Sequence, residues 1–211
     1  MATAGAEAPV TPLRERKKRS TRDALRRSAV TMVGAHGLNA VTVDDITAAV
    51  DISARTFFNY FACKEDAVVG WDPLMVAELC EHLVGRPLDE TPPEALRRVL
   101  VEVFGHYDAD HRELLQRMRL IRTDPRLVAH HAARWGDLER ELVAALAERR
   151  GTDPDNDYYA GLVVATTLAT GRVAMMSWCD NEGRVPLAEL LPRYLDVLGA
   201  GLAEPAREDA I

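Results

Sequence analysis

The amino-acid sequence predicts an all-α fold, and three observations support this prediction. Apolar residues recur at three- and four-residue spacing along most of the 211 residues, as they do on the buried face of a helix. Prolines fall where these helices would begin and glycines where they would end, which is the usual asymmetry of helix termini. The sequence has neither strand-like alternation nor the Asn-Gly and Asp-Gly turns of hairpins.

The N-terminal third predicts three helices that follow a flexible tail at residues 1–12. Gly37 closes the first helix, since glycine readily adopts the left-handed conformation of a C-cap. Thr42 and Ser53 are suitable N-caps for the second and third helices. The last two helices are short and closely joined, which is typical of a helix-turn-helix. The expected helices span residues 13–36, 42–50 and 54–61.

The rest of the chain predicts further helices, each bounded by a proline, a glycine or a polar turn. We place the domain boundary after residue 63, so that residues 13–63 form the helix-turn-helix domain and residues 64–211 form a second domain. The expected helices of this second domain are Lys64–Val84, Pro92–Asp108, His111–Arg122, Asp124–Arg150, Asp153–Cys179 and Pro186–Leu202.

The charges are divided unevenly along the chain. Residues 1–64 carry ten Lys and Arg against six Asp and Glu, a net charge of +4, whereas the remainder carries 16 against 27, a net charge of −11. A basic head suits binding to a polyanion, because Lys and Arg displace the counterions of a phosphate backbone. The acidic remainder would repel DNA and confine contact to the head. Taken alone, the same asymmetry also fits a solvated, disordered basic arm.

The sequence disfavours several classes of protein. No apolar run approaches the roughly 18–20 residues of a membrane span, and no hydrophobic signal core follows the basic N-terminus. Three widely spaced cysteines without a CxxC pattern favour reduced thiols. Metal-ligand candidates are His106, Asp110 and His111, and the adjacent His130 and His131. His106 and Asp110 lie one helical turn apart, but no third ligand follows from the sequence, and adjacent histidines point to different faces of a helix. We therefore expect a cytoplasmic protein with no membrane partner, no cofactor, no metal site and no catalytic residues.

The stretch from Thr21 to Lys64 resembles the N-terminal domain of TetR-type transcriptional regulators. More than a dozen positions match the pattern of that family at fixed spacings. The resemblance implies a three-helix DNA-binding head, a six-helix ligand-binding and dimerisation body, and a homodimer formed through the last two helices. The positions that carry it are Thr21-Arg22, Ala29, Gly37, Thr42, Ile46, Ala49, Ile52-Ser53, Arg55–Phe61 and Lys64-Glu65.

The sequence departs from that family pattern within the motif. Asp51 stands where a glycine is usual in the turn, and aspartate tolerates the left-handed conformation better than most residues. Phe58 stands where a tyrosine is common, so a hydroxyl that would contact phosphate is absent there. At positions 60 and 64 the sequence has the tyrosine and the lysine of the family pattern.

The third helix of the head is expected to read base edges in the major groove with its N-terminal residues. Arg55 is the best donor to guanine O6 and N7, and Asn59, one turn later on the same face, suits adenine. Ala54 and Thr56 offer methyl groups to thymine. Two phenylalanines spaced four apart, Phe57 and Phe61, are expected to anchor the helix to the core.

Other residues of the head are expected to hold the DNA backbone. The resemblance implies phosphate contacts at Thr42, Tyr60 and Lys64. A basic arm would follow the backbone or enter the minor groove. That arm contains Arg14, Arg16, Lys17, Lys18, Arg19 and Arg22.

The motif Thr56–Phe61 and the segment after Leu114 are similar to regulators with an acyl-CoA-like ligand-binding domain, among them those of the mycofactocin system. This implies a small hydrophobic effector, with acyl-CoA as a candidate. Its phosphates would need basic partners, while its chain would lie among methionines and aromatic rings. The same residues equally suit a plain core and surface ion pairs. The candidates are Trp71, Met75, Leu79, Phe104, Arg117, Met118, Arg119, Arg122, Trp135, Met175 and Trp178.

The last two helices are the expected dimer interface, because isologous packing of two such helices gives a four-helix seam. Two heads one helical turn apart would then read palindromic double-stranded DNA. A ligand in the body would move the helix beginning at Lys64 and so change the spacing of the heads. Small residues that allow close approach of the helices are Ala160, Gly161, Ala165, Ala169 and Gly171.

Together these patterns indicate a ligand-responsive DNA-binding regulator, most simply a repressor. Two alternatives are open at this point. One is an all-helical acyl-processing enzyme whose basic arm is incidental, and the other is a DNA-binding protein without sequence preference. The enzyme would need a nucleophile with its base, a Gly-rich phosphate loop or a metal cluster, and the sequence shows no such group.

Overall fold

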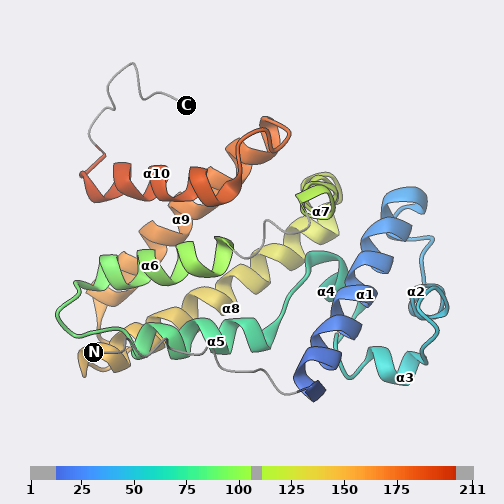
Figure 1. The fold of residues 1–211 in the computed structure, drawn as a ribbon, viewed down its shortest axis with the longest axis horizontal. Helices are drawn as coiled ribbons and strands as arrows, with labels where there is room; N and C mark the ends of the chain where they lie inside the picture. Colours follow the sequence, from blue (N-terminus) through green and yellow to red (C-terminus); the bar gives the residue numbers. More distant parts are fainter. Residues whose placement is uncertain (1–12, 106–110, 203–211) are drawn as a thin grey trace, which may run out of the picture. The chain divides into compact units, whose positions relative to one another are not determined.

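The chain divides into two compact units, Met1–Gly70 and Trp71–Ile211, which are described separately. A computed structural model describes residues 13–105 and 111–202 (Figure 1), with the backbone alone at residues 13–15, 104 and 105. Every regular element in these ranges is an α-helix, so the prediction of an all-α fold is confirmed.

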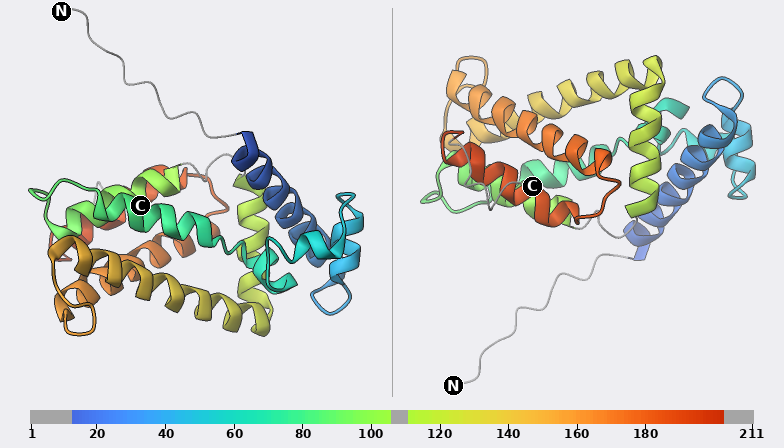
Figure 2. Two further views of the ribbon diagram at one scale, coloured as in Figure 1. Left: turned by 90° about the horizontal axis from the view of Figure 1, so that it is seen from below. Right: turned by 90° about the horizontal axis from the view of Figure 1, so that it is seen from above.

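The first unit consists of α1 to α4. The long helix α1 packs against α2 and α4, and α2 packs against α3 (Figures 1 and 2). Its core is apolar, with Leu25, Ala29, Ile46 and Phe57 fully buried. The four helices span Leu13–His36 (α1), Val43–Ala48 (α2), Ala54–Phe57 (α3) and Lys64–Val69 (α4).

Two turns of this unit use the left-handed backbone conformation. Gly37 follows α1 with a φ of 82°, as the sequence predicts. Asp51, between α2 and α3, has a φ of 54°. A short polar side chain tolerates this conformation, so the turn of the helix-turn-helix forms without glycine. The N–H of Ile52 closes the turn by donating to the carbonyl of Thr47 at 3.2 Å.

The second unit consists of α5 to α10. Helices α5, α6, α8 and α9 surround its main core, in which Leu83, Leu96, Leu142 and Val164 are fully buried. Helix α10 packs on α6 and α9, and α7 runs across α8 and α9 (Figure 2). The helices span Pro73–Val84 (α5), Pro92–Gly105 (α6), His111–Thr123 (α7), Pro125–Arg150 (α8), Tyr158–Asp180 (α9) and Leu187–Gly199 (α10).

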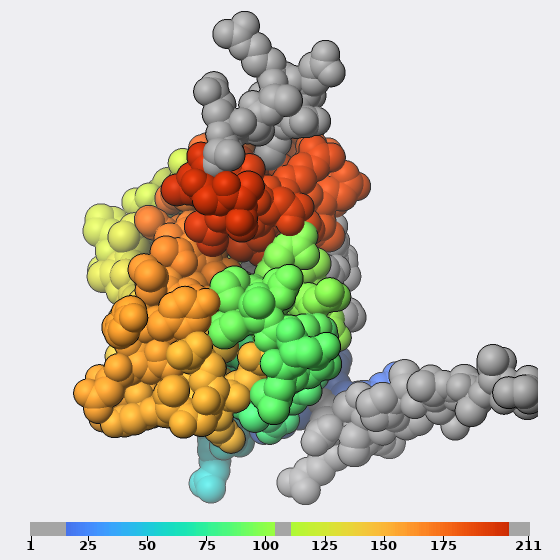
Figure 3. Space-filling view, turned by 90° about the vertical axis from the view of Figure 1, so that its left-hand side faces the viewer, coloured from blue at the N-terminus to red at the C-terminus, as the bar shows by residue number. Residues whose placement is uncertain are grey.

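One face of the second unit brings together the α5–α6 turn, the end of α8 and helix α10 (Figure 3). Arg149, in the last turn of α8, joins two of these segments. Its guanidinium donates to the backbone carbonyls of Pro87 and Glu90, the second at 2.8 Å. This contact holds the α5–α6 turn against α8.

The prediction of a single helix from Lys64 to Val84 is wrong. Helix α4 ends at Val69, and Gly70 follows with a φ of 75°. Helix α5 begins anew at Pro73, where the Asp72 side chain accepts a hydrogen bond from the N–H of Leu74 at 3.0 Å. A C-cap glycine followed by an N-cap aspartate and a first-turn proline stops one helix and starts the next. The units therefore divide after Gly70, later than the predicted boundary.

Helix α9 begins at Tyr158, several residues after the predicted start at Asp153. The intervening residues form a turn, in which the N–H of Asn156 donates to the carbonyl of Asp153 at 3.1 Å. Among the described residues, α9 alone is long and apolar enough to cross a membrane. It packs against α6, α8 and α10 as a core helix does, so this property is weak evidence for a membrane span.

Candidate nucleic-acid interface and effector site

Helix α3 and the turn that follows it carry exposed polar side chains on a buried aromatic anchor. The predicted helix over residues 54–61 ends earlier, at Phe57, because the N–H groups of Asn59 and Tyr60 donate to carbonyls three residues back, at 3.1 and 2.8 Å, and so form a tighter turn. Arg55 and Asn59 are exposed, as base contacts require, and Tyr60 is half-buried. Phe57 is fully buried, and its ring centroid lies 5.6 Å from that of Phe61, which is 3% exposed. The prediction that the two phenylalanines anchor this helix to the core is confirmed.

Ser53 fixes the start of α3. Its Oγ accepts a hydrogen bond from the N–H of Thr56 at 3.1 Å and lies 2.9 Å from the Thr56 hydroxyl. Thr56 and Ala54 are both half-buried. Of the four predicted base-reading residues, Arg55 and Asn59 therefore extend furthest into solvent, and thymine contacts by Ala54 and Thr56 stay predictions.

Arg22 supports the motif from within the head. It is 7% exposed, and its guanidinium carbon lies 4.4 Å from the centroid of the Phe61 ring, a cation–π contact. The predicted arm needs correction here, because Leu13–His36 is one continuous helix and a helix is too wide for the minor groove. The Arg14 side chain lies outside the described ones. Phosphate contacts stay predictions for the exposed Arg16, Lys17, Lys18 and Arg19.

Two of the predicted phosphate contacts also stabilise the head. The Thr42 hydroxyl accepts from the N–H of Asp45 at 3.2 Å and donates to its carboxylate at 2.6 Å, a bond that lowers the pKa of Asp45. The Lys64 ammonium donates to the carbonyls of Leu38 and Val41, both at 2.7 Å. Because an ammonium has three N–H donors, the third is the one that a phosphate would take.

Four of the predicted effector residues meet in the main core of the second unit. Leu79 is 1% exposed, and Trp71, Met75 and Trp135 are partly buried against the same cluster. The guanidinium carbon of Arg134 lies 5.5 Å from the centroid of the Trp71 ring. These aromatic and thioether side chains form a partly accessible apolar surface, which is the lining that a hydrophobic ligand requires.

His131, which the sequence offers only as a weak metal-ligand candidate, belongs to the same region. Its ring centroid lies 5.7 Å from that of Trp135. Burial, followed by the positive charges of Arg117 and His130, lowers the pKa of His131. Arg117 is itself 8% exposed, so its charge lies inside the unit. Periodicity could not reveal this grouping, because α7 and α8 contribute residues that are distant in sequence.

Three other predicted effector residues lie in a different cluster. Trp178 is 1% exposed in a core formed by α7, α9 and α10, and Met118 and Met175 pack against it. The ring of His111 meets Trp178 edge-on, with 4.8 Å between the centroids. The predicted effector residues therefore form two groups. The Phe104 side chain lies outside the described ones, as do His106 and Asp110.

Arg119 and Arg122 form ion pairs on the surface of the second unit. Arg122 lies 2.6 Å from the carboxylate of Asp180, and Arg119 lies 3.5 Å from that of Glu182. Both arginines are largely exposed, at 41% and 61%. The pairs join α7 to the C-terminal end of α9, as the surface ion-pair alternative expects. Contacts of these two residues with an effector stay predictions.

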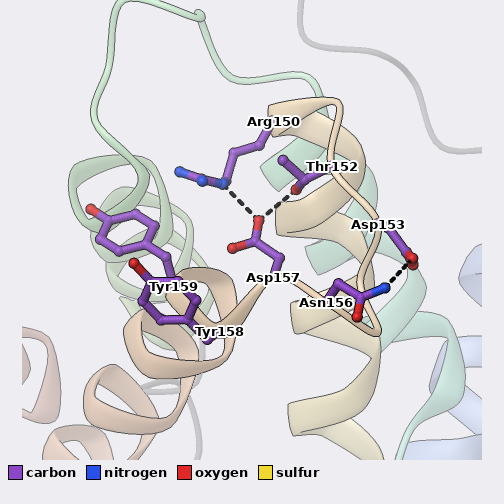
Figure 4. A pocket seen from close by; sticks show the side chains of 7 residues that line it. All are labelled: Arg150, Thr152, Asp153, Asn156, Asp157, Tyr158 and Tyr159. Atoms are coloured by element: carbon purple, nitrogen blue, oxygen red, sulfur yellow. Dashed lines mark hydrogen bonds and ion pairs between the residues drawn. The ribbon is translucent and has the colours of Figure 1, made fainter.

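An open pocket of about 570 Å³ lies at the turn between α8 and α9 (Figure 4). Asp157 accepts hydrogen bonds there from the Thr152 hydroxyl, the N–H of Ala160 at 2.9 Å and the Arg150 guanidinium at 2.8 Å. These bonds lower the pKa of Asp157 to about 2, and the bond from Thr152 has the largest influence. Arg150 also covers the ring of Tyr159 at 4.7 Å. Because these polar groups bond one another, we interpret the pocket as a structural corner that starts α9.

Replacing Asp157 with alanine is expected to lower the melting temperature by a few degrees at neutral pH, because α9 loses its N-cap and Arg150 its partner. The lowered pKa of Asp157 stabilises the fold above the ordinary carboxyl pKa, and this contribution is lost as the pH falls toward 2. Thermal scans at pH 7, 5 and 3 should therefore show a gap between the two proteins that narrows below pH 4. Asp155→Ala, which removes an exposed carboxylate of the same turn, is the control. A difference in melting temperature that is constant with pH would contradict the stabilising role of the ionised Asp157 carboxylate.

The outer face of α9 is apolar and exposed. Tyr158, Leu162, Val173 and Met176 recur at helical spacing and are 39–86% exposed. An apolar stripe of this kind is typical of surfaces that take part in interactions. Ala160 does not belong to it, because that residue is fully buried in the core of its own unit. The expected contribution of Ala160 to a helix–helix interface is therefore corrected.

The first unit has the geometry of a helix-turn-helix DNA-binding domain: a capped α2, a left-handed turn and a short α3 with exposed polar residues. Residues 25–68 match the family described as bacterial regulatory proteins, tetR family, and residues 90–203 match the MftR C-terminal domain. This chain belongs to the TetR family of bacterial transcriptional regulators. Both resemblances predicted from the sequence are thereby confirmed.

Two similar proteins are named as transcriptional regulators. The regulator TcmR of Streptomyces glaucescens is 33% identical over 79% of this chain and 76% of its own length. A protein of Mycobacterium tuberculosis named as the mycofactocin biosynthesis transcriptional regulator MftR is also 33% identical, over 82% of this chain and 87% of its own. Both relatives are thus named as regulators of transcription.

Solved structures agree in fold with this chain. FadR of Thermus thermophilus, a repressor solved with lauroyl-CoA, superposes with a TM-score of 0.52 at 22% identity, over 90% of this chain and 99% of that one. SmeT, solved with triclosan, superposes with a TM-score of 0.57 at 17% identity, over 91% and 98%. At these identities the likeness shows the fold alone.

Proposed function

We propose that this protein is a homodimeric repressor that binds a palindromic operator and releases it when a small hydrophobic effector binds to the second unit. One observation carries the DNA-binding part of the proposal. In α3 and the turn directly after it, Arg55 and Asn59 are exposed while Phe57, which lies between them, is fully buried. The helix is therefore held by one side and leaves its polar side for a partner.

The partner that this polar side fits is the major groove of DNA. Arginine donates two hydrogen bonds to guanine O6 and N7, and asparagine pairs with adenine N6 and N7. Arg55 and Asn59 are four residues apart, so they share a face in a helical segment and can address neighbouring base pairs. We assign backbone contacts to Thr42, Tyr60 and Lys64, together with the exposed basic residues at the start of α1.

The dimer is proposed to form through α9 and α10. The stripe on α9 that contains Leu162 and Val173 is apolar, exposed and long enough to pack along a second copy of itself. Such self-complementary packing around a two-fold axis gives the symmetry that a palindromic operator needs. The small residues Gly161 and Ala165 flank the stripe and allow close approach of the two helices.

The effector is proposed to bind beside Trp71, Met75 and Trp135, where apolar side chains are partly accessible. An acyl-CoA is the leading candidate, because the C-terminal part of the chain matches the MftR C-terminal domain and a structure of the same fold was solved with lauroyl-CoA. Trp71 precedes α5, and Met75 lies in its first turn. A ligand there would act on α5 and, through the Gly70–Asp72 connection, on α4. We assign the protein to the cytoplasm and propose no catalytic role.

The test begins with an operator selected from random duplexes by the wild-type protein, followed by mobility-shift titrations at fixed salt. Arg55→Ala should lose the preference for one base pair in each half-site and weaken operator binding by about 1–3 kcal/mol per half-site. Arg98→Ala, which removes an exposed arginine of the second unit, is the matched control. Lauroyl-CoA should raise the melting temperature and reduce operator binding, whereas free CoA should do neither.

Each arm of this test can contradict the proposal. Equal weakening by Arg55→Ala on operator and random DNA would mean that Arg55 contacts phosphate only. Failure of the wild-type protein to select any sequence would remove the repressor function. A ligand that raises the melting temperature and leaves operator affinity unchanged would contradict the effector mechanism.

A further inference from the structure

Phe58 is an exposed aromatic side chain on the DNA-reading helix. It is 57% exposed, whereas Phe57 beside it is fully buried and Phe61 is 3% exposed. Within residues 16–70, whose side chains the structure describes, Phe58 is the one large hydrophobic residue that stays exposed. Packing in the core of the head therefore does not explain why a large hydrophobic residue stands at position 58.

The position of Phe58 is well defined by its neighbours. It forms the C-cap of α3 with helical backbone angles, and its N–H donates to the carbonyl of Ala54 at 3.2 Å. Its ring meets the ring of Phe57 edge-on, with 5.5 Å between the centroids. Contact with a buried ring restricts the motion of Phe58. The exposed ring is thus held in one place, three residues after Arg55 and directly before Asn59.

We infer that Phe58 contacts the C5 methyl group of a thymine in each half-site and so determines part of the operator sequence. The inference rests on the proposed function. Phe58 lies between Arg55 and Asn59, which we assign to base edges, so its ring enters the same groove. A phenyl ring neither donates nor accepts a conventional hydrogen bond, and thymine is the one base whose major-groove edge carries an apolar group. The exposed ring and the thymine methyl group lose water together on binding.

The discriminating experiment removes the methyl group without changing the base pair. Each thymine of the selected operator is replaced in turn by deoxyuridine, and Kd is measured by titration for the full-length protein. At one position per half-site, wild-type binding should weaken about fourfold, and about tenfold or more when both half-sites are changed. Phe58→Ala should bind the thymine and uridine operators equally well at that position. Arg55→Ala, which lacks a different contact, should keep the thymine preference.

A folding control accompanies the titrations: the melting temperature of Phe58→Ala should equal that of the wild type, because the side chain is largely exposed. The inference is overturned if no thymine shows a methyl effect, or if Phe58→Ala keeps the wild-type ratio between the two operators. Uniform weakening on all sequences would overturn it as well, since the ring would then pack on sugar and phosphate. Failure of the wild type to select an operator would instead defeat the proposed function.

Discussion

Replacing Phe57 with alanine is expected to destabilise the DNA-binding head by about 3–5 kcal/mol, because the side chain is fully buried and its loss leaves a cavity. That is a large part of the stability of so small a unit. The rings of Phe58 and Phe61 both contact Phe57, so its removal also loosens α3. Amide hydrogen exchange along residues 13–70 measures the effect directly, and operator binding should fall in parallel.

The neighbouring residue provides a matched control for this prediction. Phe58→Ala removes the same group of atoms one position later, where the side chain is 57% exposed, and should change stability by no more than about 0.5 kcal/mol. Both variants should lose operator affinity, but only Phe57→Ala should lose amide protection. Equal protection in the two variants would contradict the prediction that the buried Phe57, and not the exposed Phe58, stabilises the head.

Replacing Leu162 with arginine is expected to convert the protein to a monomer at micromolar concentration. The side chain is 57% exposed within the apolar stripe on α9, and two arginines facing each other across a two-fold axis would repel and lose hydration. Without the dimer, each head binds its half-site independently, and operator affinity should fall by about 10²–10⁴-fold. Analytical ultracentrifugation and operator titration measure the two effects.

The control for the dimer prediction is Leu88→Arg. Leu88 is 79% exposed in the α5–α6 turn and lies outside the stripe, so this variant should stay dimeric and bind operator as the wild type does. If Leu162→Arg remained dimeric, the interface would lie elsewhere on the molecule. If it became monomeric with unchanged operator affinity, the heads would not require the dimer for binding.

The head was largely predictable from sequence because its signals are local. The Thr42 cap, the left-handed Asp51 and the spacing of Phe57 and Phe61 each depend on residues within one or two turns. The separation of α4 from α5 was also encoded locally, by Gly70 and Asp72-Pro73, yet the continuing apolar periodicity on both sides concealed it. In this segment the helix-stop signals outweigh the apolar periodicity, because a left-handed glycine ends the hydrogen-bond ladder of the helix.

The sequence by itself determined that α3 has an anchor and a polar face, because a period of 3.6 residues places Phe57 and Phe61 on one side. Only the tertiary structure decided which arginines are buried, which form contacts within the protein and which extend into solvent. Arg22 covers the ring of Phe61, Arg122 pairs with Asp180, and Arg117 is buried, while Arg55 extends from the head. The physical reason is that the environment of a long, charged side chain is made by residues from other helices, which local periodicity does not specify.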